Sequence, residues 1–120
     1  MNKDTVTEKI IGCAFMVHNT LGAGFLEKVY ENALFYELEK SGTRVVRQSR
    51  IEVVYKDVIV GEYIADLIVE GYCIVEVKAV KAIDNNHHAQ VLNYLRATDL
   101  KTALLLNFGA PKLEIKRFSM

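Results

Sequence analysis

The strongest signal for the fold lies in residues 63–80, which read YIADLIVEGYCIVEVKAV. It is rich in β-branched and aromatic residues and has one glycine, Gly71, near its middle, which predicts two strands joined by a short turn. If the turn is a three-residue loop centred on Gly71, antiparallel pairing matches residues that are equally distant from it. Asp66 then lies opposite Glu76, and the side-chain period of two places Lys78 on the same face as Glu76.

Asp66, Glu76 and Lys78 would form a charged patch on otherwise apolar strands. Two carboxylates in a partly dry site repel each other, and a divalent cation between them relieves the repulsion. Lys78 would add a positive charge facing a substrate phosphate or an attacking water. The alternative is a sheet with one wet face, on which the three residues form weak salt bridges. The apolar residues around Glu76 and Lys78 favour a central strand.

The rest of the chain predicts an α/β protein with the element order ααβββαββ. Apolar residues three and four apart indicate helices, and runs rich in β-branched residues indicate strands. A continuous apolar run, as in residues 102–108, is typical of a strand buried on both faces. The predicted helices cover residues 4–21, 25–40 and 84–97, the last with Asp84 as N-cap, and the other strand segments are 45–46, 51, 53–55, 58–60 and 113–118.

The second predicted helix carries a candidate carboxylate. Glu27 shares a stripe with Tyr30, Leu34 and Leu38, which we expect to be the inward face of this helix. A buried glutamate needs a partner, and a metal ion or a lysine at the site would serve. The alternative is a first-turn glutamate that stays solvated and favours the helix N-terminus by its charge.

The third predicted helix places Gln90 and Tyr94 on one face, with His87 one turn earlier. Gln90 could bind a phosphate oxygen or orient a water on the metal, and Tyr94 could hydrogen-bond to or stack on nucleic acid. A tyrosine at helical spacing is also a common core residue. The His87-His88 pair has no matching cysteine or second histidine pair, which argues against a zinc site.

Length and composition limit the number of domains and the class of protein. The 120 residues fit one domain, and the 51% hydrophobic and 25% charged fractions are those of an ordinary globular protein. No apolar run is long enough for a bilayer span and no secretory segment is visible, so we expect a cytoplasmic protein without a membrane partner. Two distant cysteines, Cys13 and Cys73, are expected to be buried free thiols.

The charges are balanced, with 15 Lys plus Arg against 15 Asp plus Glu. Bulk electrostatics therefore give no attraction to nucleic acid, and any binding must come from a local patch. Arginines on the first strand and lysines after the third could form a phosphate-binding strip, or could simply be solvated. The residues of this candidate strip are Arg44, Arg47, Arg50, Lys78 and Lys81.

Two motifs resemble known families. Asp66, nine intervening residues, Glu76-Val77-Lys78 and then Gln90-x-x-x-Tyr94 resemble the PD-(D/E)XK nuclease pattern, in the subgroup of helicase-associated exonucleases. The segment 24–30, GFLEKVY, is similar to the GxxExxY signature of a bacterial and archaeal family of small proteins. That family opens approximately VHxxLGPGxLExxY, and residues 17–24 follow it except for Ala23 in place of proline, which affects loop stiffness.

The resemblance covers about residues 10–118 and implies a restriction-endonuclease-like core, with a mixed central sheet flanked by helices. It implies metal binding by Asp66 and Glu76, with Mg²⁺ or Mn²⁺ as the ion, and catalysis by Lys78. The supporting residues that it implies are Glu27 at the helical acidic position, Gln90 and Tyr94, and the candidate residues bordering the cleft are His18 and His87. A lone helical histidine such as His18 is more often a core residue.

Our first hypothesis is therefore a metal-dependent nuclease that hydrolyses phosphodiester bonds of DNA. The second is a non-catalytic module that binds nucleic acid or a partner protein on a nuclease-like fold. A third is a small-molecule or tRNA-processing enzyme on the same scaffold, because fold does not fix function.

Overall fold

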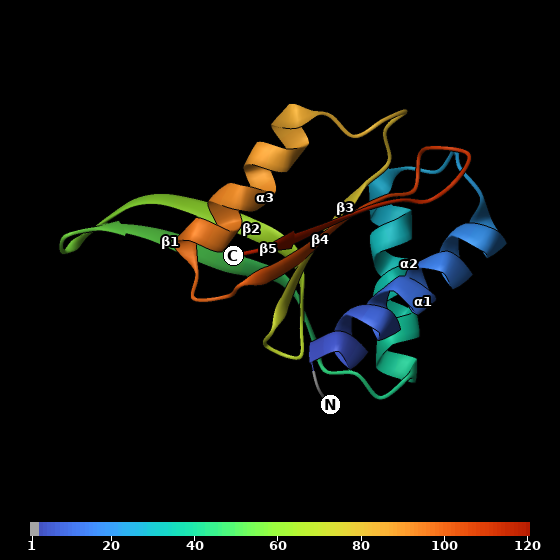
Figure 1. The fold of residues 1–120 in the computed structure, drawn as a ribbon, viewed down its shortest axis with the longest axis horizontal. Coiled ribbons are helices and arrows are strands. Elements are labelled where there is room, and N and C mark those ends of the chain that lie inside the picture. Colours follow the sequence, from blue (N-terminus) through green and yellow to red (C-terminus); the bar gives the residue numbers. More distant parts are fainter. Residues whose placement is uncertain (1–2) are drawn as a thin grey trace.

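The structure is a computed structural model that describes residues 3–120. Its elements follow the predicted order ααβββαββ (Figure 1). They are α1 (Lys3–Leu21), α2 (Glu27–Lys40), β1 (Val45–Tyr55), β2 (Val58–Val69), β3 (Cys73–Lys78), α3 (Asn85–Ala97), β4 (Thr102–Asn107) and β5 (Glu114–Ser119).

The five strands form one mixed sheet in the order β1-β2-β3-β4-β5. Strands β1, β2 and β3 make the predicted antiparallel meander, and β4 pairs antiparallel with β5. Only β3 and β4 are parallel, and a parallel pair needs a crossover, which α3 provides. The β3–β4 pair is thus the centre of the sheet, as the apolar flanks of Glu76 predicted.

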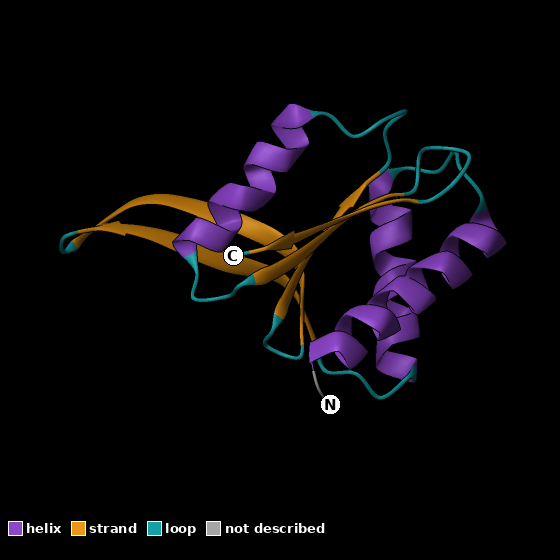
Figure 2. Cartoon of the chain, in the orientation of Figure 1, coloured by secondary structure: helices purple, strands orange, loops and turns teal. Residues whose placement is uncertain are grey.

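Helices cover the two faces of the sheet unequally (Figure 2). Helices α1 and α2 pack on one face over a core that includes Leu67, Val75 and Leu104. Helix α3 packs on the other face over a smaller core that includes Ile74 and Leu105. Alternate residues of β3 and β4 therefore belong to different cores, and β4 is buried along its whole length, as predicted for residues 102–107.

Details of the predicted elements also hold. The pairs Leu67↔Val75 and Val69↔Cys73 are equally distant from Gly71, so the predicted register of the β2–β3 hairpin is confirmed. Asp84 caps α3 by accepting hydrogen bonds from the backbone N–H groups of Asn86 and His87.

Other details differ from the prediction or refine it. Helix α2 begins at Glu27 rather than Phe25, and the fragments predicted between residues 45 and 55 form one strand. Cys13 and Cys73 are free and buried, as predicted. Among the described residues, no helix combines the length and apolarity needed to cross a bilayer.

Candidate functional site

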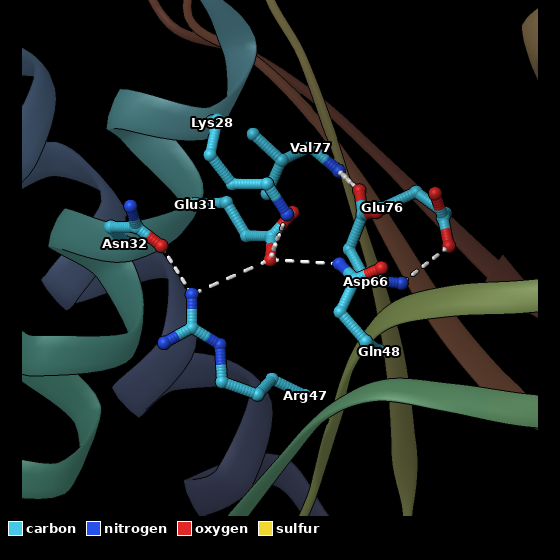
Figure 3. Close-up of polar contacts among 8 residues, drawn as sticks. All are labelled: Lys28, Glu31, Asn32, Arg47, Gln48, Asp66, Glu76 and Val77. Atoms are coloured by element: carbon cyan, nitrogen blue, oxygen red, sulfur yellow. Dashed lines mark hydrogen bonds and ion pairs between the residues drawn. The ribbon is translucent and has the colours of Figure 1, made fainter.

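Two carboxylates meet where β2 and β3 separate. The backbone ladder between these strands ends at Leu67↔Val75, and the next opposed residues are Asp66 and Glu76. Here side chains replace the ladder: Asp66 N–H donates to Glu76 Oε1 at 3.0 Å, and Val77 N–H donates to Asp66 Oδ2 at 2.8 Å (Figure 3). One oxygen of each carboxylate is thus tied to the backbone of the neighbouring strand.

A backbone irregularity on β1 faces Asp66. The β1–β2 register runs through Arg47↔Leu67 and Ser49↔Ala65 and omits Gln48, the residue opposite Asp66. Gln48 has φ 51°, a left-handed conformation that side chains with a Cβ rarely adopt. Leu67 packs in the α1–α2 core, whereas Ala65 packs in the α3 core, although both would share a face of a regular strand. Strand β2 therefore changes faces at Asp66.

Burial and mutual repulsion favour the protonated form of Glu76 in the Asp66–Glu76 pair. Glu76 is only 2% exposed. Burial, reinforced by the negative charge of Asp66, raises its pKa to about 9. Burial also raises the pKa of Asp66, opposed by the Val77 N–H that stabilises its charged form. The side chains are close enough to hydrogen-bond to each other, so a Glu76 proton directed at a charged Asp66 satisfies both.

Lys78 supplies positive charge beside this pair. It is half-buried at the end of β3, and its charge lowers the pKa of Glu27, Asp66 and Glu76. Among the side chains of residues 5–120 its ammonium group has no ion-pair partner within 4.0 Å, unlike Lys28 or Arg47. The ammonium group of Lys78 is thus available to an incoming anion.

Strand β4 holds the backbone segment that follows Lys78 in place. Asn107 at the end of β4 is fully buried, and its side-chain amide clamps Val80: the oxygen accepts from Val80 N–H at 2.9 Å, and the nitrogen donates to Val80 O at 2.9 Å. Gly109 lies against the same segment, and a Cβ there would come within 2.4 Å of the Val80 carbonyl oxygen. Only glycine fits at this approach.

Glu27 lies at the margin of the site and is not the buried helical carboxylate that the sequence suggested. It is exposed in the first turn of α2, as in the solvated alternative. Partial desolvation still raises its pKa, and Lys78 opposes this shift while Asp66 reinforces it. Glu27 therefore interacts electrostatically with the site without being enclosed by it.

The buried carboxylate of α2 is Glu31, one turn later, which the sequence reasoning missed. It is 2% exposed and accepts hydrogen bonds from Lys28 Nζ at 3.2 Å and Gln48 Nε2 at 2.9 Å (Figure 3). Arg47 lies 3.7 Å away and also bonds Asn32. The charge of Glu31 raises the pKa of Asp66. The available signal was its spacing to Leu34 and Leu38, which matches that of a buried stripe.

Tyr30, the last residue of the GxxExxY segment, has a structural role. Its hydroxyl donates to Gly22 O at 2.5 Å and accepts from Phe25 N–H at 3.1 Å, while its ring stacks on Phe108 at 4.9 Å. Gly24, the first residue of the segment, has φ 117°, a conformation available mainly to glycine. Both residues shape the loop that starts α2 and so position Glu27.

Helix α3 brings Gln90 and Tyr94 to the other side of the carboxylate pair. Gln90 Nε2 donates to the Tyr94 hydroxyl at 3.0 Å, and the Tyr94 ring contacts Tyr63 at 5.2 Å. Tyr94 is 4% exposed, and burial together with the charges of Glu76 and Asp66 raises its pKa to about 12. Tyr94 is thus a core residue that also faces the site.

The predicted histidines make structural contacts. His18 is buried, and its Nε2 lies 3.0 Å from Ala110 O, which ties α1 to the loop after β4. His87 Nδ1 accepts from Asp84 N–H at 3.1 Å and completes the capping box of α3. These contacts account for both residues without a role at the carboxylates.

Two of the three arginines of the suggested phosphate-binding strip are engaged within the molecule. Arg47 bonds to Asn32 and lies beside Glu31, and Arg50 pairs with Glu62 at 2.5 Å. The strip is therefore not a row of free cations.

The carboxylate pair fits a hydrated divalent cation. Among the side chains that the structure describes, no group of three or more His, Cys, Asp or Glu converges as a closed metal centre would. Asp66 and Glu76 offer two oxygen ligands, and Mg²⁺ commonly binds proteins through one or two carboxylates and several waters. An all-oxygen donor set suits Mg²⁺ or Mn²⁺ better than zinc.

Comparison with protein families gives one match: the model described as PD-(D/E)XK nuclease superfamily matches residues 4–118. This match contains every site residue described above. Comparison with curated proteins and with solved structures gave no match.

Proposed function

We propose that this chain, which belongs to the PD-(D/E)XK nuclease superfamily, hydrolyses phosphodiester bonds of DNA in a reaction that requires Mg²⁺ or Mn²⁺. Its mixed sheet with helices on both faces is the restriction-endonuclease-like core of that superfamily. The supporting observation is the meeting of Asp66 and Glu76 at the divergence of β2 and β3, with the unpaired Lys78 beside them.

Each residue of the site has a proposed role. Asp66 and Glu76 would hold the ion, which when bound would polarise a phosphoryl oxygen and make water a better nucleophile. Lys78 donates to the phosphoryl oxygens as negative charge develops on them. Glu27, exposed and with a raised pKa, can accept or return a proton at the margin of the site.

The Gln90–Tyr94 pair supports the site from α3. Tyr94 is protonated at neutral pH and remains a hydrogen-bond donor into the alkaline range, because its pKa is raised to about 12. Gln90 has a side-chain oxygen free of the Tyr94 contact and can orient a water or a phosphate group.

The proposal is tested by cleavage and by metal binding, measured separately. Single-stranded, double-stranded and branched DNA are incubated with the protein and Mn²⁺ or Mg²⁺, and Mn²⁺ binding is measured by calorimetry. We expect Asp66→Asn to lose both DNA cleavage and Mn²⁺ binding, and Lys78→Ala to lose cleavage while keeping Mn²⁺ binding. Glu39→Gln, an exposed change on α2, is the matched control and should keep both. Failure of the native protein to cut any of the DNA forms would contradict the proposal.

A non-catalytic module is the second candidate. The pairing of Arg47 and Arg50 with glutamates within the fold favours it. A module that grips no phosphate backbone needs few free cations. The two candidates differ in the carboxylate pair, which a non-catalytic module would not use for an ion. Mn²⁺ binding that Asp66→Ala abolishes would exclude this candidate.

A further inference from the structure

The β1–β2 hairpin extends beyond the rest of the molecule as a two-stranded ribbon (Figure 1). Strand β2 pairs with β3 only through Leu67, Ile68 and Val69, so within the sheet its residues 58–65 pair with β1 alone. Helix α3 contacts the inner part of this ribbon at Tyr63 and Ala65. A two-stranded ribbon is marginally stable by itself in water. This ribbon is therefore a candidate for a partner that extends or covers it.

The ribbon exposes an unusual amount of apolar surface. Its tip exposes six large apolar side chains by 47% to 61%, and a seventh lies at the inner end of β1. Isolated exposed apolar residues are common, but a contiguous group marks an interaction surface. The residues are Val54, Tyr55, Val58, Ile59, Val60 and Ile64 at the tip, and Val46 at the inner end.

The outer edge of β1 is open for further pairing. Strand β1 is the last strand of the sheet, so half of its backbone N–H and C=O groups face away from β2. Natural proteins often blunt such an edge with a proline, a bulge or a covering loop. Strand β1 has irregularities at Gln48 and between Val53 and Val54, so residues 49–53 are the regular stretch that can accept a further strand. Helix α2 contacts β1 at Arg47 and Gln48, at the inner end of the strand. A hollow of about 490 Å³ separates Arg50, Ile51 and Glu52 from the end of α3 at Ala97 and Thr98.

The charges on this edge are self-complementary in one register. Glu52 lies directly opposite Glu62, an unfavourable pair, and the salt bridge of Arg50 neutralises Glu62. If a second β1 pairs antiparallel about a two-fold axis at Ile51, Arg50 of each copy faces Glu52 of the other. An axis at Glu52 would oppose two glutamates, and one at Val53 would oppose Arg50 and Lys56.

We propose that β1 pairs with β1 of a second copy of this chain, antiparallel and centred on Ile51, to form a continuous ten-stranded sheet. This register carries each apolar ribbon tip toward the inner end of the partner's β1, where Val46 is 53% exposed. A second copy fits better than nucleic acid because the ribbon tip is apolar and the chain has no net charge. The proposal is independent of the proposed nuclease activity.

Reversal of the two charges tests both the partner and the register. Light scattering after size-exclusion chromatography should give the native protein twice the monomer mass of 13.6 kDa. Arg50→Glu and Glu52→Arg, made singly, place like charges opposite each other twice per dimer and should weaken dimerisation by at least about tenfold. The double variant restores two opposite-charge pairs and should dimerise again. Lys112→Glu, an exposed change outside the ribbon, is the control.

A second measurement covers the case in which a variant folds poorly. Hydrogen exchange of native β1 amides should slow between residues 49 and 53 as the protein concentration rises, while exchange in α1 stays constant. A monomeric native protein at hundreds of micromolar would overturn the proposal. Single and double charge reversals with the same effect would overturn the register.

Discussion

Glu76→Gln should stabilise the metal-free protein at alkaline pH even though it removes a site residue. Glutamine keeps the hydrogen bond from Asp66 N–H, because its side-chain oxygen can replace Oε1 of Glu76. Its side-chain nitrogen can donate to the Asp66 carboxylate, as a protonated Glu76 would. The substitution therefore keeps the local contacts and removes only the ionisation.

The size of the effect follows from the raised pKa of Glu76. The carboxyl group titrates near 4.5 when the chain is unfolded and at about 9 when it is folded. The folded protein thus keeps a proton that the unfolded chain has released, so the contribution of this group to stability is complete below pH 4.5 and falls as the pH rises toward 9. At about 1.4 kcal/mol per pKa unit, the loss between pH 5 and pH 8 reaches about 4 kcal/mol.

The assay is urea unfolding followed by circular dichroism at pH 5 and pH 8, in the presence of a chelator. We expect the native protein to lose at least about 2 kcal/mol between the two values, and Glu76→Gln to lose much less. Glu39→Gln, exposed on α2, should behave like the native protein. Added Mn²⁺ should restore stability at pH 8 to the native protein and not to Glu76→Gln. Equal pH dependence in the native protein and Glu76→Gln would refute the reasoning.

Three further substitutions test separate parts of the site. Lys78→Ala should lower kcat for cleavage by about a hundredfold or more and leave the affinity for Mn²⁺ unchanged. An equal loss of Mn²⁺ affinity would show that Lys78 contributes to ion binding instead. Glu31→Gln should lower the pKa of Asp66, measured by NMR titration, because the negative charge of Glu31 raises it in the native protein. An unchanged pKa of Asp66 would show that the two carboxylates do not interact. Tyr30→Phe should cost about 1 to 3 kcal/mol in thermal unfolding, since the hydrogen bonds to Gly22 and Phe25 are lost. A negligible change on Tyr30→Phe would mean that the loop holds its shape without the hydroxyl.

The central hairpin could be predicted from the sequence because its register depends on local information. The turn at Gly71 and the period of two fix which residues oppose each other, and these signals are strong in residues 63–80. The same signals are sufficient to predict Asp66 opposite Glu76 from the sequence alone. The near-continuous apolar run of residues 102–108 likewise predicted a fully buried strand.

Glu31 escaped prediction because its environment comes from distant segments. Both Glu27 and Glu31 lie at helical spacing from buried leucines, and only the packing of α2 against β1 decides which one is covered. The left-handed conformation of Gln48 brings its amide to Glu31, and no residue type at that position signals it. The change of faces at Asp66 is a product of the same irregularity, which alternation in the sequence cannot reveal.

The amide clamp of Asn107 on Val80 determines which positions near Lys78 can change during evolution without moving it. The direction in which the backbone departs from Lys78 is set by a side chain of the adjacent strand, not by the connecting residues 81–83. Insertions or altered chemistry in that connection should therefore leave the lysine where it is. The connection is thus free to vary and to acquire new contacts, while Asn107 and Gly109 are the two positions at which change would displace the lysine itself.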